Sequence, residues 1–251
     1  MSQKNRNKEI SRRQAIGILA VAGVGVIAGC GGGAKTSNTT TTTTTNSSCI
    51  VSPEGEEGPY FVNDSAKGFA RSDIRSNLDG SNTQDGIPLK LSISVFDSEN
   101  SCAAMANVQV DIWHCNASGV YSAEGVESTS GETWLRGYQL TDSNGLVTFV
   151  TIVPGWYAGR TTHIHLRLRS SYDSTSTGGT NTTQLFFSQD VITTISTTIS
   201  PYSAEGTNPT TNATDHVYAG EVSGETLLTL SGDTTSGYTA AFKVNLPITA
   251  I

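Results

Sequence analysis

Apolar and polar residues alternate along most of the chain between residues 89 and 250. The alternation is clearest over 89–95, 108–112, 138–140, 146–152, 163–168 and 238–246. A period of two places every second side chain on the same face of a β-strand. Turn-forming residues separate several of these runs, as in the Asp-Ser-Asn-Gly sequence at 142–145. The pattern therefore predicts short strands joined by turns.

Helical periodicity is not evident in this part of the sequence. No segment beyond residue 30 carries a clear apolar stripe with a period of 3.6 residues. We expect the Ser/Thr-rich segments 171–182 and 193–214 to be loops, with one short strand at 184–187 between them. The predicted fold is therefore all-β, a two-sheet antiparallel β-sandwich with long loops.

The first 30 residues have the composition of an export signal. Five basic residues and one acidic residue accompany an apolar run at 15–28, which is shorter than the roughly 20 residues of a membrane-spanning helix. Segment 11–17 resembles a twin-arginine signal, and the Ile-Ala-Gly-Cys sequence at 27–30 resembles a bacterial lipobox. We therefore predict an exported lipoprotein, anchored through a lipidated Cys30 at the periplasmic or extracellular face of the cell envelope.

Residues 31–48 are rich in Gly, Thr and Ser and are expected to form a flexible tether. Residues 49–251 remain, which is a suitable length for one domain. The chain has a net charge of −7, and loss of the signal's five basic residues and one acidic residue would lower it to −11. Because the sequence lacks a Lys/Arg cluster, we expect no nucleic-acid partner.

Three cysteines follow the signal: Cys49, Cys102 and Cys115. In an oxidising compartment they predict one disulfide and one free thiol. The strand expected between Cys102 and Cys115 would separate their backbones by roughly 20 Å, whereas bridged Cα atoms lie about 4 to 7 Å apart. This favours a disulfide that includes Cys49, with its partner left open.

Segment 154–165, Pro-Gly-Trp-Tyr-Ala-Gly-Arg-Thr-Thr-His-Ile-His, concentrates the residues suited to chemistry. His163 and His165 begin the alternating run 163–168, so both imidazoles project from one strand face and can share a metal ion. An isolated His-x-His sequence is more often a polar strand face with two solvated histidines. The metal hypothesis therefore depends on residues elsewhere in the chain.

Four sequence blocks supply that context: EGPYF at 57–61, DIWHCNASGVY at 111–121, LRG with its TDSNG turn within 135–145, and the segment 154–165. In this order they resemble the intradiol ring-cleavage dioxygenases, in particular their small exported members. These are non-haem ferric enzymes that open catechols between the two hydroxylated carbons. The resemblance spans residues 49 to 246 and implies that residues 49–251 form a catalytic β-sandwich domain.

The resemblance implies that Tyr121, Tyr157, His163 and His165 bind a ferric ion, Fe(III). Phenolate oxygens are hard donors that favour ferric over ferrous iron, and a nearby cation would keep both tyrosines ionised. Either tyrosine alone would more often be a half-buried aromatic with a hydrogen-bonded hydroxyl. A zinc or copper site on the two histidines is the weaker alternative, because zinc usually recruits Cys or carboxylate ligands.

Catalytic roles also follow from the resemblance. Tyr157 is expected to leave the metal when the catechol binds and to accept a substrate proton. Arg160 is expected to stabilise negative charge on the substrate ring, and Gln184 to lie near the substrate. The implied reaction incorporates O2 and yields a muconate-type diacid.

Other residues of the matching blocks have less defined roles. Segment 57–61 either lines the pocket or packs the N-terminal arm, while Trp113 and His114 are expected to be structural. Only Ala158 and Gly159 separate Tyr157 from Arg160, whereas the familiar catechol and protocatechuate enzymes have a longer insertion there. The substrate is therefore open among catechol, protocatechuate, hydroxyquinol and plant- or lignin-derived diphenols, and a more open cleft is expected.

A second functional class is a non-catalytic, lipid-tethered β-sandwich that binds a partner at the cell surface, since a fold alone implies no function. This alternative explains the tether and the strands. It gives no reason for Tyr121, Tyr157, His163, His165 and Arg160 to occur together. The oligomeric state is open under either reading.

Overall fold

The computed structural model describes residues 50–63, 68–169 and 180–247, which belong to one compact unit. The predicted signal, tether and lipidation site at Cys30 lie outside these residues. Within the described ranges, no helix combines the length and apolar character that crossing a bilayer requires.

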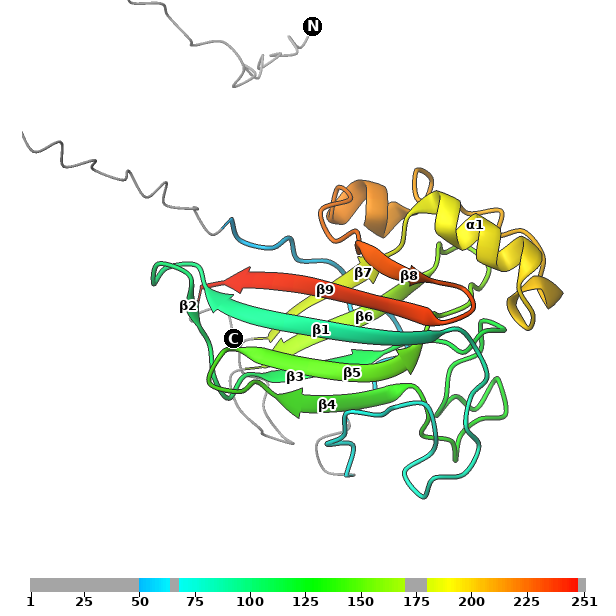
Figure 1. The fold of residues 1–251 in the computed structure, drawn as a ribbon, viewed down its shortest axis with the longest axis horizontal. Coiled ribbons are helices and arrows are strands. Elements are labelled where there is room, and N and C mark those ends of the chain that lie inside the picture. The colour runs from blue at the N-terminus through cyan, green and yellow to red at the C-terminus, as the bar shows by residue number, and fades with distance from the viewer. Residues whose placement is uncertain (1–49, 64–67, 170–179, 248–251) are drawn as a thin grey trace, which may run out of the picture. The chain divides into compact units, whose positions relative to one another are not determined.

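The described strands form two sheets, which confirms the predicted β-sandwich. The first sheet has the order β2-β1-β9-β8, with β5 also paired to β1, and the second has the order β4-β3-β6-β7. In Figure 1, β9, β1 and β5 run side by side in front of β3, β6 and β7, while β4 lies at the lower edge of the view. The bounds are β1 Pro88–Asp97, β2 Ala103–Ala104, β3 Gln109–Trp113, β4 Arg136–Leu140, β5 Leu146–Ile152, β6 His163–Arg169, β7 Thr180–Phe186, β8 Leu230–Asp233 and β9 Gly237–Leu246.

One strand pair departs from the antiparallel expectation. Strands β1 and β9 run parallel, from the Leu89–Tyr238 pair to the Asp97–Leu246 pair. Antiparallel neighbours can be joined by a short hairpin, whereas parallel neighbours need a long connection. Strand β9 follows β1 only after the whole second sheet and forms an antiparallel hairpin with β8, so no direct connection to β1 sets its direction beside that strand.

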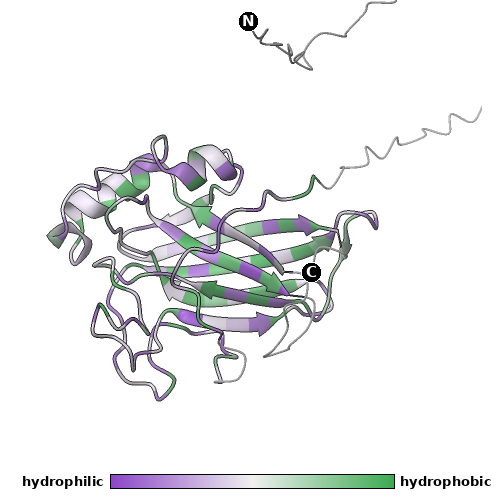
Figure 2. Ribbon diagram, turned by 180° about the vertical axis from the view of Figure 1, so that it is seen from behind, coloured by the Kyte–Doolittle hydropathy of each residue, from purple (hydrophilic) through white to green (hydrophobic). Residues whose placement is uncertain are grey.

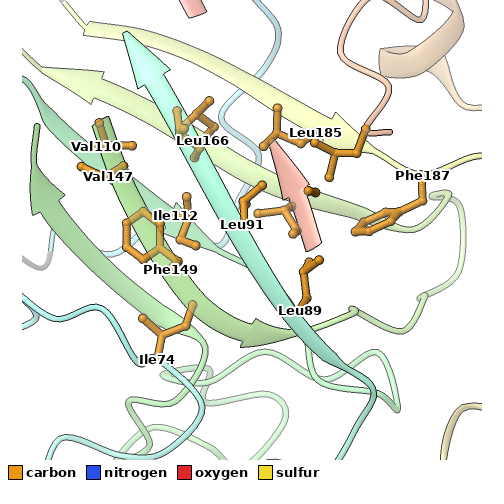
Figure 3. Close-up of a cluster of buried hydrophobic side chains, with 14 of the residues drawn as sticks. Ile74, Leu89, Leu91, Val110, Ile112, Val147, Phe149, Leu166, Leu185 and Phe187 are labelled. Atoms are coloured by element: carbon orange, nitrogen blue, oxygen red, sulfur yellow. The ribbon is translucent and has the colours of Figure 1, made fainter. Parts of the chain in front are cut away.

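The alternating pattern explains the core. Along β1, Leu89 and Leu91 are buried between the sheets while the intervening residues are more exposed, and Figure 2 shows the same alternation of hydropathy along the strands. Figure 3 shows Leu89 and Leu91 in one buried cluster with Ile112 of β3 and Leu166 of β6. Full burial of one such side chain contributes about 1.5 to 3 kcal/mol to folding.

Strands β3 and β6 are buried on both faces. Their inner face contributes Ile164, Leu166 and Leu168 to the core. Their outer face carries His163 and His165, and the N-terminal segment 55–61 covers part of it. The second sheet therefore supplies both a core surface and a sheltered polar surface.

The region predicted as a loop at 193–214 contains helical structure, so that prediction is wrong in part. Helix α1 spans Gln189–Thr198 and is followed by the short 3₁₀ helix η1 Tyr202–Ala204; the π-helix η2 Val217–Glu221 lies just beyond the predicted loop. Figure 1 shows α1 outside the two sheets. Ile192 and Ile195 of α1 are buried against the core. Its threonines have low helix propensity and obscured this pattern; Thr194 and Thr198 donate hydroxyl hydrogen bonds to carbonyls four residues earlier.

The other prediction for this region concerns the strand expected at 184–187. Strand β7 contains most of it but begins earlier, at Thr180, so the prediction of a loop is wrong for residues 180–182. The remainder of the predicted loop 171–182, residues 171–179, lies outside the described residues.

The cysteines agree with the expectation of one disulfide and one thiol. Cys102 is disulfide-bonded, and Cys115 is a buried free thiol. The partner of Cys102 lies outside the described residues, as does Cys49, so the predicted involvement of Cys49 stays a prediction.

Candidate metal centre

The four predicted ligand side chains converge on one point. The Nε2 atoms of His163 and His165 are 3.1 Å apart. The Tyr121 hydroxyl lies 3.1 Å from His165 Nε2, and the Tyr157 hydroxyl lies 3.2 Å from His163 Nε2. Donor atoms that bind one ion at about 2.1 Å lie roughly 3 Å from their neighbours. The spacing therefore suits a shared metal ion.

The two imidazoles are arranged as metal ligands rather than as a hydrogen-bonded pair. His163 Nδ1 donates to the Thr161 carbonyl over 2.6 Å, which leaves a lone pair on Nε2. The Nδ1 atom of His165 is buried without a hydrogen-bond partner among the described residues. Burial lowers the pKa of His163 to about 3 and that of His165 well below its ordinary value. Both rings are therefore neutral at physiological pH, the form that binds metals.

The phenols need a cation to ionise. Tyr121 is 1% exposed, and burial raises its pKa well above 10. Burial also raises the pKa of Tyr157, although the nearby Arg160 charge opposes that rise. A metal ion between the donors would reverse this preference and stabilise both phenolates. These donors therefore fit a highly charged, oxygen-preferring ion such as ferric iron.

Close packing of two loops brings the tyrosines together. Gly119 has a φ of +80°, and a Cβ there would lie 2.1 Å from the Trp156 carbonyl oxygen. Gly155 likewise approaches Ala117, and its amide donates to the Asn116 carbonyl over 3.0 Å. Only glycine allows both this approach and the left-handed conformation at residue 119. The two glycines thus fix the relative position of the loops that carry Tyr121 and Tyr157.

Trp113 and His114 support the site without contributing ligands to it. Trp113 lies opposite His165 in the β3–β6 register, and their rings stack with centroids 4.8 Å apart and an interplanar angle of 6°. His114 bonds through Nε2 to the Thr151 hydroxyl of the first sheet, over 2.7 Å, and through Nδ1 to the Cys115 carbonyl. The expectation that both residues are structural is consistent with these contacts.

Tyr60 packs directly on the centre. Its ring stacks on Tyr121 with centroids 4.2 Å apart. Arg136, which is buried, donates to the Tyr60 carbonyl over 2.6 Å and lies 5.9 Å from the Tyr121 ring centroid. Burial and the charges of Glu127 and Glu124 raise the pKa of Tyr60. Segment 57–61 therefore packs the N-terminal arm against the site, and its role in lining a substrate pocket stays a prediction.

Arg160 and Gln184 lie together beside the centre. Gln184 is the cross-strand neighbour of His165 on β7, and its side-chain oxygen accepts a hydrogen bond from Arg160. Arg160 is 7% exposed, and its Nε donates to Asp215 Oδ2 over 2.8 Å. The guanidinium is consequently held in one orientation by two partners.

The sequence reading missed Asp215. Its carboxylate is buried and accepts hydrogen bonds from Arg160 and from the backbone amides of Thr161, Val217 and Tyr218. Burial raises its pKa, but these hydrogen bonds outweigh burial and hold the pKa below its usual value. No local pattern marks Asp215, since its partner lies 55 positions away. An Asp inside a Ser/Thr-rich stretch is ordinarily a turn residue.

Comparison with known proteins defines the family. A protein-family model described as Dioxygenase matches residues 56–204. The intradiol ring-cleavage dioxygenase from Tetranychus urticae is 26% identical, with a TM-score of 0.63 over 79% of this chain and 96% of that one. The dioxygenase domain of a carbohydrate-binding fusion protein from Streptomyces sp. SirexAA-E is also 26% identical, with a TM-score of 0.54 over 78% of this chain and 98% of that one. The chain belongs to the intradiol ring-cleavage dioxygenase family.

A relative of known activity matches a shorter stretch. The catechol 1,2-dioxygenase of Acinetobacter baylyi is 32% identical over 109 residues, which are 43% of this chain and 32% of that protein. The matched stretch therefore spans about a third of the length of this relative.

Proposed function

We propose that the protein is a non-haem Fe(III) dioxygenase that cleaves a catechol between its hydroxylated carbons with O2 and releases a muconate-type diacid. The convergence of Tyr121, Tyr157, His163 and His165, with donor contacts of 3.1 to 3.2 Å, carries the proposal. Membership of the family supports it.

In this proposal the four side chains hold the ferric ion, which when bound supplies a Lewis acid that binds the catechol and activates it towards O2. The neutral imidazoles contribute lone pairs and the phenolates contribute negative charge. Tyr121 is fixed by its stacking on Tyr60, and His165 by its stacking on Trp113. These contacts preorganise one side of the centre.

Tyr157 is the better candidate for a proton acceptor. It is only partly buried, unlike Tyr121. It also begins a tight turn, closed by a hydrogen bond from the Arg160 amide to the Tyr157 carbonyl, with Ala158 and Gly159 exposed at its tip. A phenolate at a solvent-facing turn can move towards the substrate and accept a hydroxyl proton.

Arg160 supplies a fixed positive charge beside the reacting ring. Its guanidinium stays protonated at any working pH, and Asp215 and Gln184 hold it in place. A preorganised cation stabilises charge that develops on the substrate without having to reorient during the reaction. In this scheme Gln184 acts mainly by orienting Arg160.

The proposal is tested by the metal content and visible spectrum of the purified protein after incubation with iron. Phenolate-to-iron charge transfer should colour it red to burgundy, and the band should shift when catechol is added without O2. A colourless protein that binds stoichiometric zinc, or no metal, would contradict the proposal and favour the surface-binding alternative.

We also propose export and lipid attachment at Cys30, on the basis of the signal-like sequence of residues 1–30. Fractionation of cells that express the full chain should recover the protein with the membrane, and Cys30→Ser should abolish incorporation of a labelled fatty acid. Equal labelling of the variant would contradict this assignment.

A further inference from the structure

Segment 56–60 passes along one side of the candidate centre. The Gln184 amide donates to the Glu56 carbonyl over 3.0 Å. A Cβ on Gly58 would lie 3.0 Å from His165 Cε1, and Tyr60 stacks on Tyr121 as described above. The backbone therefore brings Glu56 next to the site.

The Glu56 side chain reaches Arg160 but is not buried by it. Its Oε1 lies 3.8 Å from Arg160 Nη1, and the side chain is 42% exposed. The other face of Arg160 is already neutralised by the buried Asp215. One carboxylate, that of Asp215, already balances the Arg160 charge, so Glu56 adds an excess negative charge. The Glu56 side chain faces solvent next to Arg160.

The surroundings of Tyr121 are also rich in carboxylates. Arg136 Nη2 lies 4.0 Å from Glu124 Oε1. Glu127 accepts a hydrogen bond from the Tyr121 amide over 2.6 Å. Arg136 and Arg160 are therefore two guanidinium groups among four carboxylates near the ligand residues. The carboxylates are those of Glu56, Glu124, Glu127 and Asp215.

The remaining nearby cations do not offset this excess. Arg167 pairs with Glu57, and Arg169 pairs with Asp111. The described lysines, Lys90 and Lys243, lie on strands of the other sheet. His216 Nε2 lies 3.1 Å from Glu56 Oε1 and is exposed. The guanidinium groups of Arg136, Arg160, Arg167 and Arg169 therefore each have a carboxylate neighbour. The Arg71 guanidinium is engaged by the backbone carbonyls of Ser76, Thr133 and Arg136.

We infer that the site accepts catechols whose ring substituent is neutral or cationic and discriminates against carboxylated catechols, with Glu56 as a specificity-determining residue. This inference rests on the proposed function. A ring carboxylate would face like charge with no free cation to pair with, whereas an ammonium substituent would be attracted. Because Glu56 is solvent-exposed, its share of the discrimination is modest and sensitive to salt.

Binding without turnover gives the first test. The iron-loaded protein is titrated calorimetrically, without O2, with catechol, 3,4-dihydroxybenzoate and 4-(2-aminoethyl)catechol at about pH 8, well above the ordinary pKa of an imidazole. The carboxylated compound should bind about tenfold more weakly than the aminoethyl compound. Raising the ionic strength from about 20 to 200 mM should narrow the gap. Equal or tighter binding of the carboxylated compound would overturn the inference.

Variants then isolate Glu56. Glu56→Gln should improve binding and kcat/KM for the carboxylated compound about fivefold relative to catechol, while Glu56→Asp should retain most of the discrimination. Glu99→Gln, an exposed charge removal in the turn after β1, serves as the control and should change neither ratio. An equal loss for all three compounds in Glu56→Gln would instead mean that Glu56 only positions Arg160, and would overturn its assigned role.

Turnover in air distinguishes a failure of the proposed dioxygenase activity from a failure of the charge preference. If none of the three compounds is cleaved, the proposed function itself fails. If the carboxylated compound is cleaved as well as the others, the dioxygenase proposal stands and only the charge inference fails.

Discussion

Arg160 and Asp215 form a buried ion pair in which the guanidinium Nε lies 2.8 Å from the carboxylate Oδ2. The same carboxylate oxygen accepts the Thr161 amide over 2.9 Å. Asp215 thus fixes both the Arg160 side chain and the backbone that leads into His163. This pair links the turn that carries Tyr157 to the segment before η2.

Asp215→Asn keeps the size of the side chain but removes its charge. We expect Arg160 to lose its fixed orientation and kcat to fall about 10- to 100-fold, as is typical when a supporting partner is lost. Iron content and the visible band should persist, because Asp215 touches no ligand atom. An unchanged kcat would contradict a positioning role, and loss of iron would show that the residue instead maintains the ligand geometry.

Tyr157→Phe removes a hydroxyl whose described contact is His163 Nε2. The fold should tolerate the change because the side chain is only partly buried. The visible band of the iron-loaded protein should shift or weaken, and turnover should fall about 100-fold or more, as expected for loss of a ligand that also accepts a proton. Tyr202→Phe, a buried hydroxyl loss away from the centre, is the spectroscopic control. An unaltered band in Tyr157→Phe would remove Tyr157 from the centre.

Gly119→Ala tests the loop contact that joins the tyrosines. The added Cβ would meet the Trp156 carbonyl oxygen, and the φ of +80° is unfavourable for alanine. Gly80→Ala is the matched control, since Gly80 has a φ of +83° and no atom within 4 Å of the added Cβ. The control should lose about 1 to 2 kcal/mol of unfolding free energy, and Gly119→Ala clearly more. Equal losses in chemical denaturation would mean that the loops are not in tight contact.

His114 should make the fold sensitive to acid. Burial lowers its pKa from 6.5 to about 4, so between these values the unfolded chain binds a proton that the folded chain does not. The stabilising contribution is complete above pH 6.5 and falls towards pH 4, by about 1.4 kcal/mol per pH unit at most. His114→Gln should reduce this slope when both proteins are unfolded in the same metal state. Identical slopes would show that His114 does not remain neutral in the fold.

Local patterns predicted much of the fold and the shared face of the two histidines, whereas the tyrosines of the centre were inferred from the family resemblance. Alternation over 163–168 predicted the shared face of His163 and His165, and that face carries the converging donors. The strand positions followed from the same rule. These features depend on neighbouring residues, which a single sequence displays directly.

The missing features depend on contacts between distant segments or on weak local preferences. The direction of β9, the Arg160–Asp215 pair and the place of Glu56 are set by tertiary packing. Helix α1 was missed because its threonines favour extended structure while two isoleucines anchor it to the core.

The most direct test of the central claim is the fate of labelled oxygen. The iron-loaded protein is supplied with a catechol under 18O2, and the product is analysed by mass spectrometry. Intradiol cleavage predicts a muconate-type diacid that contains oxygen from 18O2 in its new carboxyl groups, and no such product from Tyr157→Phe above a small residual rate. An aldehyde-containing product, or a diacid without label, would contradict the account.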